Sequence, residues 1–322
     1  MEMMMAAVFD DGLKLVRDRA IAEPRSGWAR IKVMVAGICK TDMEIMKGYL
    51  GFRGVLGHEF VGIVDQCEDQ AWIGQRVIGE INAACGHCHW CTQGLERHCP
   101  DRTTLGILNH DGCMAEYCIL PKKNLFVVPA DISNEQAVLT EPLSAACEIL
   151  EQLPIRGNER VVVLGDGRLG ILCAWALSTV ASDVTLIGRH PEKLSLAQWH
   201  GIRSRMGTDG IGGGADIVVE ATGSEQGLGT AISLCRPRGT IILKSTIAIH
   251  GDVNLSAVVI NELTILGSRC GRFGDGLAMM NKFPDMPLTR MISARYPLSE
   301  VHEAFIRARH PDVLKVLLDI AK

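Results

Sequence analysis

The stretch at residues 161–170 constrains the fold most, because a short apolar strand runs directly into a glycine turn. The turn carries Gly165, Gly167 and Gly170 in the spacing Gly-x-Gly-x-x-Gly. In such a strand–turn–helix the first glycine permits the tight turn, the second lets a pyrophosphate approach bare backbone, and the third lets the helix pack closely on the strand. A helix expected over residues 168–180 would direct the positive end of its dipole at the phosphates.

By itself this glycine pattern fits an ordinary strand–turn–helix equally well. A second apolar strand at residues 184–187 follows at the spacing of one βαβ unit, and this context favours dinucleotide binding. We expect Arg168 and Leu169, which begin the helix, to contact the dinucleotide together with the glycines.

From residue 159 onward, apolar strands alternate with helical segments, which is typical of a parallel sheet covered by helices. The expected strands lie at residues 161–164, 184–187, 216–220, 239–243 and 263–266. Thr222 and Gly223 follow the third of these strands, at the carboxyl edge where such sheets bind ligands. We therefore predict a doubly wound Rossmann sheet with Thr222 and Gly223 at the cofactor.

The residues after the second strand bear on which dinucleotide binds. NAD binders place an acid about 20 residues after the glycine turn to accept a hydrogen bond from the ribose 2′-hydroxyl. Here that region reads Gly188, Arg189 and His190, with Lys193 in the following turn. A guanidinium in place of the acid suits a 2′-phosphate, so the sequence predicts NADP(H) over NAD(H). The alternative is that Arg189 only stacks on the adenine.

Four cysteines form the sharpest chemical signal in the chain. Their intervals are three, three and eight residues, and the members are Cys85, Cys88, Cys91 and Cys99. Four thiolates so spaced can close a tetrahedron around one zinc ion and leave no position open for a substrate, so this zinc is expected to be structural. The alternative is a set of unpaired thiols in a loop. A zinc ribbon for nucleic acid usually pairs two CxxC knuckles and carries a basic, aromatic surface, whereas the flanks of this cluster are mixed.

Three further segments carry potential metal ligands. Cys39 ends one expected strand, while His58 and Glu59 stand at the head of another. Glu141 lies in the first turn of a helix, where its carboxylate could instead complement the helix dipole. Each residue alone has an ordinary structural explanation. Together, a thiolate, an imidazole and a carboxylate fit a zinc site.

Bulk composition excludes several classes of protein. The chain has 322 residues, of which 47% are hydrophobic and 22% charged, with a formal net charge of −4. It is long enough for two folded domains, and its charge gives no general attraction to nucleic acid or to an acidic membrane. The longest uncharged apolar run, residues 169–182, is too short to span a bilayer. With no secretion signal and only twelve cysteines, we expect a reducing, cytoplasmic setting.

Taken together, these segments resemble the zinc-containing medium-chain alcohol dehydrogenase family over essentially the whole chain. The matching motifs occur in that family's order: Gly37-Ile-Cys39-x-Thr41-Asp42, Gly57-His58-Glu59, the four-cysteine loop, Glu141-Pro142-Leu143 and the glycine turn. The Glu-Pro-Leu variant resembles the polyol and threonine dehydrogenase branch. Two features depart from the family pattern. The chain is shorter than most members, and it carries Glu44 where many members have a histidine.

The resemblance implies the architecture. A GroES-like β-rich catalytic domain is expected at residues 1–140 and 285–322, and a Rossmann domain at 141–284. The family also implies a homodimer or homotetramer built through the nucleotide domain.

The resemblance implies the reaction as well. Cys39, His58 and either Glu59 or Glu141 would hold a catalytic zinc, in addition to the structural zinc, and a hydride would pass between a secondary alcohol or polyol and NADP(H). Thr41 would be the hydroxyl partner of the substrate oxygen and would pass its proton outward, with Glu44 as the expected acceptor. Asp42 would orient His58.

Two other readings compete with this one. The chain could be a catalytically degenerate member with a structural or sensing role, although the complete ligand set argues against it. It could also be a zinc-free enone or quinone reductase on the same scaffold, which would not need these ligands. Metal content distinguishes the readings.

Overall fold

The computed structural model describes residues 2–246 and 254–320, and these divide into two compact units. The first unit comprises Met1–Glu141 and Ile292–Lys322, and the second comprises Pro142–Met291. The sequence placed the divide at 140/141 and 284/285. The observed second divide falls seven residues later, because a 3₁₀ turn at Leu288–Met291 precedes the first strand of the returning segment.

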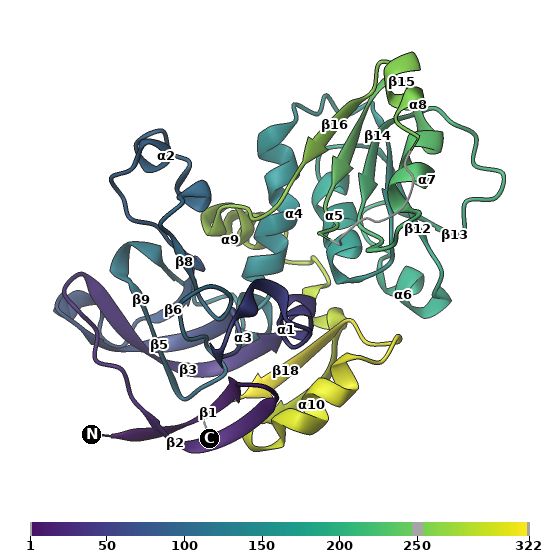
Figure 1. The fold of residues 1–322 in the computed structure, drawn as a ribbon. Helices are drawn as coiled ribbons and strands as arrows, with labels where there is room; N and C mark the ends of the chain where they lie inside the picture. Colours follow the sequence, from purple (N-terminus) through teal and green to yellow (C-terminus); the bar gives the residue numbers. More distant parts are fainter. Residues whose placement is uncertain (1, 247–253, 321–322) are drawn as a thin grey trace. The chain divides into compact units, whose positions relative to one another are not determined.

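The first unit is rich in short β-strands (Figure 1). Its strands are β1 Met3–Phe9, β2 Leu13–Ala20, β3 Trp28–Ile38, β4 Gly54–Val55, β5 Glu59–Cys67, β6 Arg76–Gly79, β7 Asn82–Ala83, β8 Thr103–Thr104, β9 Tyr117–Pro121, β10 Leu125–Val127, β17 Ile292–Pro297 and β18 Lys315–Asp319. Its helices are α1 Lys40–Ile45, α2 His89–Thr92, α3 Asn134–Ala137 and α10 Val301–Ala308.

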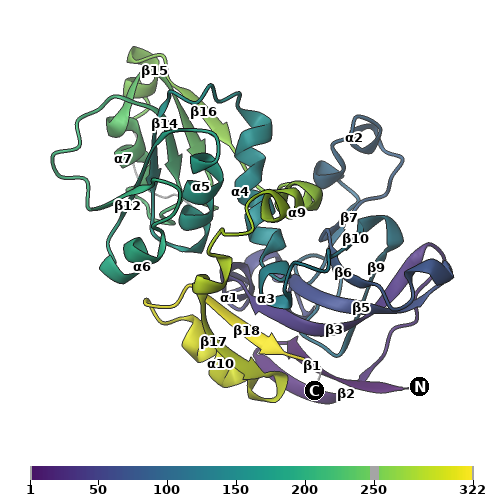
Figure 2. The same cartoon turned by 180° about the vertical axis from the view of Figure 1, so that it is seen from behind.

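A mixed sheet forms the core of this unit, in the order β10-β6-β5-β3-β18-β17, with β9 also paired to β3. Strands β3 and β5 run antiparallel with Gly37 opposite Glu59, and β18 runs antiparallel to β3 with Val316 opposite Ile38. Figure 2 shows β18 lying beside β3, although the two strands are far apart in the sequence. Strands β17 and β18 therefore extend the sheet that strands from the first part of the chain form.

The second unit is a parallel six-stranded sheet in the order β13-β12-β11-β14-β15-β16. Its strands are β11 Arg160–Leu164, β12 Asp183–Gly188, β13 Arg203–Met206, β14 Ala215–Glu220, β15 Cys235–Leu243 and β16 Thr264–Gly267. Its helices are α4 Thr140–Gln152, which begins at the divide, α5 Arg168–Ser178, α6 Pro191–Leu196, α7 Gly227–Leu234, α8 Ser256–Ile260 and α9 Phe273–Lys282. The strand order reverses at β11, as in a doubly wound sheet.

Apolar β-branched residues on the strands build the core of the second unit. Val162 and Val218 are buried on adjacent strands, and Leu228 and Ile232 of α7 pack against the same cluster. Helix α5 is buried along almost its whole length and contacts β11 and β12. The predicted fold class, a β-rich domain joined to a Rossmann sheet, is confirmed.

Candidate functional site

The three glycines of the turn after β11 have three different surroundings. Gly165 has φ +110°, and a side chain there would contact the backbone of Ala221. At Gly170 a methyl group would overlap the carbonyl oxygen of Gly165. Gly167, which caps the amino end of α5, has open space where a side chain would stand. The bare backbone at the positive end of a helix fits a pyrophosphate. Arg168 and Leu169 open that helix.

The carboxyl end of β12 holds an arrangement that the sequence did not reveal. The Asp166 carboxylate, from the glycine turn, accepts hydrogen bonds from the backbone N–H groups of Arg189 and His190, each at 2.6 Å, and from the His190 ring at 3.0 Å. Burial raises the pKa of Asp166, but these bonds outweigh it and lower the pKa below its ordinary value. Arg189 is exposed, whereas Lys193 lies in α6 with its side chain buried.

The loop after β14 is held by side chains from the end of β14 and from the segment after β15. The Glu220 carboxylate accepts a bond from the Thr222 backbone N–H at 2.8 Å, and the Gly223 N–H donates to the Ser245 hydroxyl at 2.9 Å. Thr222 and Gly223 thus lie directly after the carboxyl end of β14, beside the strand that leads into the glycine turn.

Cys39, His58 and Glu59 come together in the first unit. Their ligand atoms all lie within 4.8 Å of one another. Cys39 follows β3 and His58 precedes β5, so the antiparallel pairing of these strands brings the three residues to one end of the sheet. Glu141 is not a member of this group.

Asp42 and Thr41 support the cluster from the first turn of α1. One oxygen of the buried Asp42 carboxylate accepts a bond from the Cys39 backbone N–H at 2.8 Å, and the other lies 3.4 Å from His58 Nδ1. The Thr41 hydroxyl lies 3.7 Å from the Cys39 sulfur. Glu44, one turn further, forms an ion pair with Lys47 at 2.9 Å.

The electrostatics of the cluster suit a cation. Burial lowers the pKa of His58, but the charges and hydrogen bonds of Asp42 and Cys39 outweigh burial and raise the pKa well above its ordinary value. The imidazole is thus surrounded by groups that favour positive charge. A thiolate, an imidazole and a carboxylate within reach of one another form a donor set that fits zinc.

Lys315 is the second residue that the sequence did not reveal. Its ammonium donates to the Glu59 carboxylate and, at 3.3 Å, to the carbonyl oxygen of Ile38, with both charged side chains fully buried. A lysine in the otherwise apolar stretch 313–318 was the available signal, since a buried lysine needs a partner. The pairing holds the Glu59 carboxylate in place next to His58 in the sequence.

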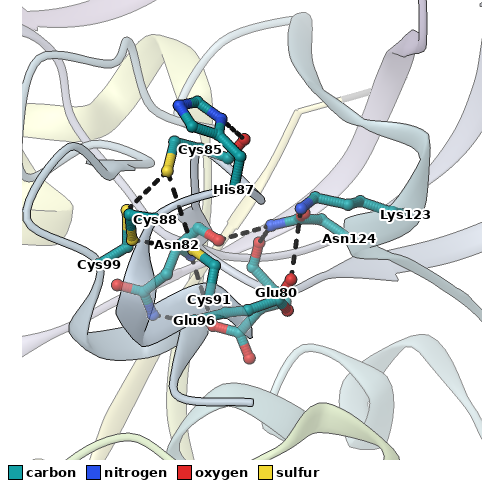
Figure 3. A network of polar contacts seen from close by, with 10 residues as sticks. All are labelled: Glu80, Asn82, Cys85, His87, Cys88, Cys91, Glu96, Cys99, Lys123 and Asn124. Carbon is teal, nitrogen blue, oxygen red and sulfur yellow. Dashed lines mark hydrogen bonds and ion pairs between the residues drawn. The ribbon is translucent and has the colours of Figure 1, made fainter. Parts of the chain in front are cut away.

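The four cysteines of the loop around α2 converge (Figure 3). Their sulfur atoms lie 3.9 Å apart for Cys85 and Cys91, 3.5 Å for Cys88 and Cys91, 3.7 Å for Cys88 and Cys99, and 3.5 Å for Cys99 and Cys85. A tetrahedron with arms of about 2.3 Å has edges of about 3.8 Å. None of the four forms a disulfide. The loop therefore has the dimensions of a closed zinc site.

Hydrogen bonds prepare this loop for a metal. The backbone N–H of His87 is the main cause that lowers the pKa of Cys85 to about 6, whereas burial raises the pKa of Cys91 to about 12. Without a metal, the thiolate form that binds metal is therefore favoured at Cys85 and not at Cys91. Just before the loop in the sequence, the backbone oxygens of Glu80 and Asn82 accept hydrogen bonds from the Asn124 side chain at 2.8 and 2.9 Å. These bonds hold the segment that leads into the loop.

The Alcohol dehydrogenase GroES-like domain family matches residues 25–130, and the Glucose dehydrogenase C-terminus family matches residues 134–320. The chain belongs to the zinc-containing medium-chain alcohol dehydrogenase family. It is an enzyme of this class, a zinc-dependent oxidoreductase that acts on a small-molecule alcohol with a nicotinamide cofactor.

Individual members of the family are similar over nearly the whole chain. L-threonine 3-dehydrogenase of Chelativorans sp. (strain BNC1) is 30% identical over 90% of each chain. The structure of a short chain alcohol dehydrogenase (rspB) from E. coli CFT073, complexed with NADH, has a TM-score of 0.90 at 26% identity over 99% of each chain. A putative zinc-binding dehydrogenase from Sinorhizobium meliloti 1021, bound to NADP, has a TM-score of 0.86 at 27% identity and covers 99% of this chain and 100% of its own.

Within the described residues, no helix is both long enough and apolar enough to cross a bilayer.

Proposed function

We propose that the enzyme transfers a hydride between a secondary alcohol or polyol and NADP(H). The main support for this proposal is that Cys39, His58 and Glu59 converge and that the Thr41 hydroxyl lies close to Cys39. A zinc ion held there would act as a Lewis acid and lower the pKa of an alcohol oxygen. L-threonine, named in the activity of one relative, is itself a secondary alcohol, which supports this substrate class.

In the proposed mechanism the residues of α1 handle the proton. Thr41 accepts the proton of the substrate hydroxyl and passes it outward. Glu44 is the proposed acceptor toward solvent, and its ion pair with the exposed Lys47 is consistent with a solvent-facing carboxylate. Asp42 orients His58 from the side of Nδ1, so the other ring nitrogen would be the one that holds the metal.

We propose Glu59 as the third ligand of this zinc. It lies within 4.8 Å of both other ligand atoms, and Lys315 restrains its carboxylate. The expectation that Glu141 ligates remains a competing proposal. Metal content separates the two, since Glu59→Gln should reduce catalytic zinc and Glu141→Gln should retain it. The reverse result would assign the role to Glu141.

Two zinc ions per chain are proposed, the second in the loop of Cys85, Cys88, Cys91 and Cys99. Cys88→Ser should lower the zinc content from two to one per chain, while Cys67→Ala, a buried cysteine outside both clusters, should leave it at two. Because a reducing compartment keeps such thiolates available for metal, the proposal includes a cytoplasmic location.

The NADP(H) preference rests on Arg189. Arg189 is exposed and follows Gly188, which has no side chain. A guanidinium can bind a phosphate group through two parallel hydrogen bonds. Arg189→Ala should lower kcat/KM for NADP+ by about tenfold or more and leave that for NAD+ nearly unchanged. Equal losses for both cofactors would contradict this role.

We also propose a homodimer or homotetramer formed through the second unit. Strand β16 is the last in the sheet order, and the adjacent helix α8 and its cap expose Leu255, Val259 and Ile260 at 58, 77 and 78%. An edge strand beside exposed apolar residues is a typical self-association surface.

The experiment that tests the function combines metal analysis with an activity panel. Secondary alcohols, polyols and amino alcohols are assayed with NADP+ and NAD+ at 340 nm. Turnover of at least one class by protein with two zinc ions supports the proposal. Cofactor binding without any turnover would favour the degenerate, sensing alternative, and full turnover by zinc-free protein would favour the reductase alternative.

A further inference from the structure

The Asp166 carboxylate fills the place of the side chain that residue 188 lacks. A side chain built on Gly188 would overlap the Asp166 carboxylate at the carboxyl end of β12. At this end of the second strand, NAD-binding Rossmann sheets place the acid that contacts the ribose 2′-hydroxyl. An acid is therefore present at this position after all, but it is supplied by the glycine turn.

The same carboxylate occupies a small anion-binding nest. Two consecutive backbone N–H groups, of Arg189 and His190, point at one Asp166 oxygen, and the His190 ring lies 3.0 Å from both oxygens. Backbone N–H groups arranged in this way bind anions such as phosphate. Asp166 is 7% exposed, so the nest is filled from within the protein.

We propose that Asp166 is a specificity-determining residue that disfavours the 2′-phosphate of NADP(H) and accepts a hydrogen bond from the ribose of NAD(H). A 2′-phosphate directed at this nest would meet a carboxylate in place of free donors. Arg189 acts in the opposite direction from the exposed side of the same turn. The cofactor preference is then a balance between Asp166 and Arg189, and removing either charge shifts it the opposite way.

This inference rests on the proposed dinucleotide at the glycine turn, but not on the hydride-transfer chemistry. The test is accordingly a direct binding measurement on the full chain, without substrate. Dissociation constants of NAD+ and NADP+ are measured by calorimetry for the wild type, Asp166→Asn and Asp183→Asn. Asp183 is the matched control, because it begins the same strand and pairs with Arg203 at the opposite end.

Asp166→Asn should raise the ratio Kd(NAD+)/Kd(NADP+) by about tenfold or more, the size expected for one charge–charge interaction in a protein. Asp183→Asn should leave the ratio unchanged. Asp166→Ser retains a hydroxyl oxygen that can accept hydrogen bonds from the turn, and it should change the ratio in the same direction. This variant replaces Asp166→Asn in the experiment if the asparagine variant folds poorly.

Three outcomes overturn the inference. If Asp166→Asn weakens the binding of both cofactors equally, Asp166 only holds the turn in place. If the ratio Kd(NAD+)/Kd(NADP+) falls, Asp166 favours the binding of NADP(H). A wild type that binds neither nucleotide overturns the cofactor site and this inference together. A ratio that shifts as expected in a protein without turnover upholds the inference while refuting the proposed dehydrogenase reaction.

Discussion

Lys315 and Glu59 form an ion pair from which solvent is entirely excluded, and Glu59 belongs to the candidate metal cluster. Replacing Lys315 with Met keeps its length but leaves a carboxylate buried without its counter-charge. We expect Lys315→Met to lower the unfolding free energy of zinc-free protein by about 3–5 kcal/mol, measured by urea denaturation. Lys122→Met, which removes a solvated pair with Asp69, is the control and should cost much less.

A double-mutant cycle checks the cause of that loss. Glu59→Gln combined with Lys315→Met should recover part of the stability, because the uncompensated charge disappears. If the two losses simply add, the charge pairing is not what Lys315 contributes.

Thr41 is predicted to serve turnover and not metal retention. Thr41→Ala should lower kcat by about 10²–10⁴-fold, the usual contribution of a positioned proton-transfer group, while zinc content stays at the wild-type value. Thr41→Ser keeps the hydroxyl and should restore most of the rate. Unchanged turnover in the alanine variant would refute the role.

The glycine turn offers a matched pair of substitutions. Gly170→Ala should cost about 1–3 kcal/mol of stability, because its methyl group meets the backbone of Gly165 in a packed interior. Gly167→Ala has open space and should leave stability nearly unchanged, but it should weaken dinucleotide binding by blocking the approach of the pyrophosphate. Thermal unfolding and calorimetric titration measure the two effects separately, and the reverse pattern would contradict the proposed site.

The lowered pKa of Asp166 predicts a pH dependence of stability. A carboxyl whose pKa is lower in the folded state stabilises above its unfolded pKa, about 3.9, and loses that contribution as pH falls through the folded pKa. The stability gap between wild type and Asp166→Asn should therefore be constant near pH 6–7 and shrink below about pH 4. A gap that does not change with pH would mean that the ionised form is not what stabilises the turn.

Self-association through α8 is tested by Ile260→Asp. A charge on this exposed apolar surface should convert the oligomer to monomer, measured by light scattering. Ile306→Asp is the control, since Ile306 is 70% exposed on α10 in the other unit. A wild-type protein that is already monomeric would contradict the proposed assembly.

The sequence predicted what is encoded locally. The glycine turn follows from backbone geometry within six residues, and the four-cysteine loop follows from spacing alone, so both could be predicted without tertiary information. Strand β13 was missed because its four residues are mostly polar, and β15 begins earlier than expected because its pairing with β14 shifts register near Ala215.

Asp166 and Lys315 could not be placed in this way, because their roles arise from contacts between distant segments. Asp166 meets Arg189 across 23 positions, and Lys315 meets Glu59 across 256. The sequence shows that an acid is missing after β12, but only the three-dimensional structure shows that the Asp166 carboxylate from a neighbouring loop fills its place. Lys193 was expected to face the cofactor, yet the turn of α6 buries its side chain.

The position of β18 in the sheet has a consequence for how the chain is made. Strands β3 and β5 are synthesised early, whereas β18, which pairs with β3 and carries Lys315, is translated only after the entire nucleotide-binding unit. While the ribosome is still elongating the middle of the chain, Glu59 lacks its ion-pair partner Lys315, and the edge of β3 that later pairs with β18 is unpaired. Nascent chains stalled before residue 315 should therefore be the species that chaperones hold and proteases remove.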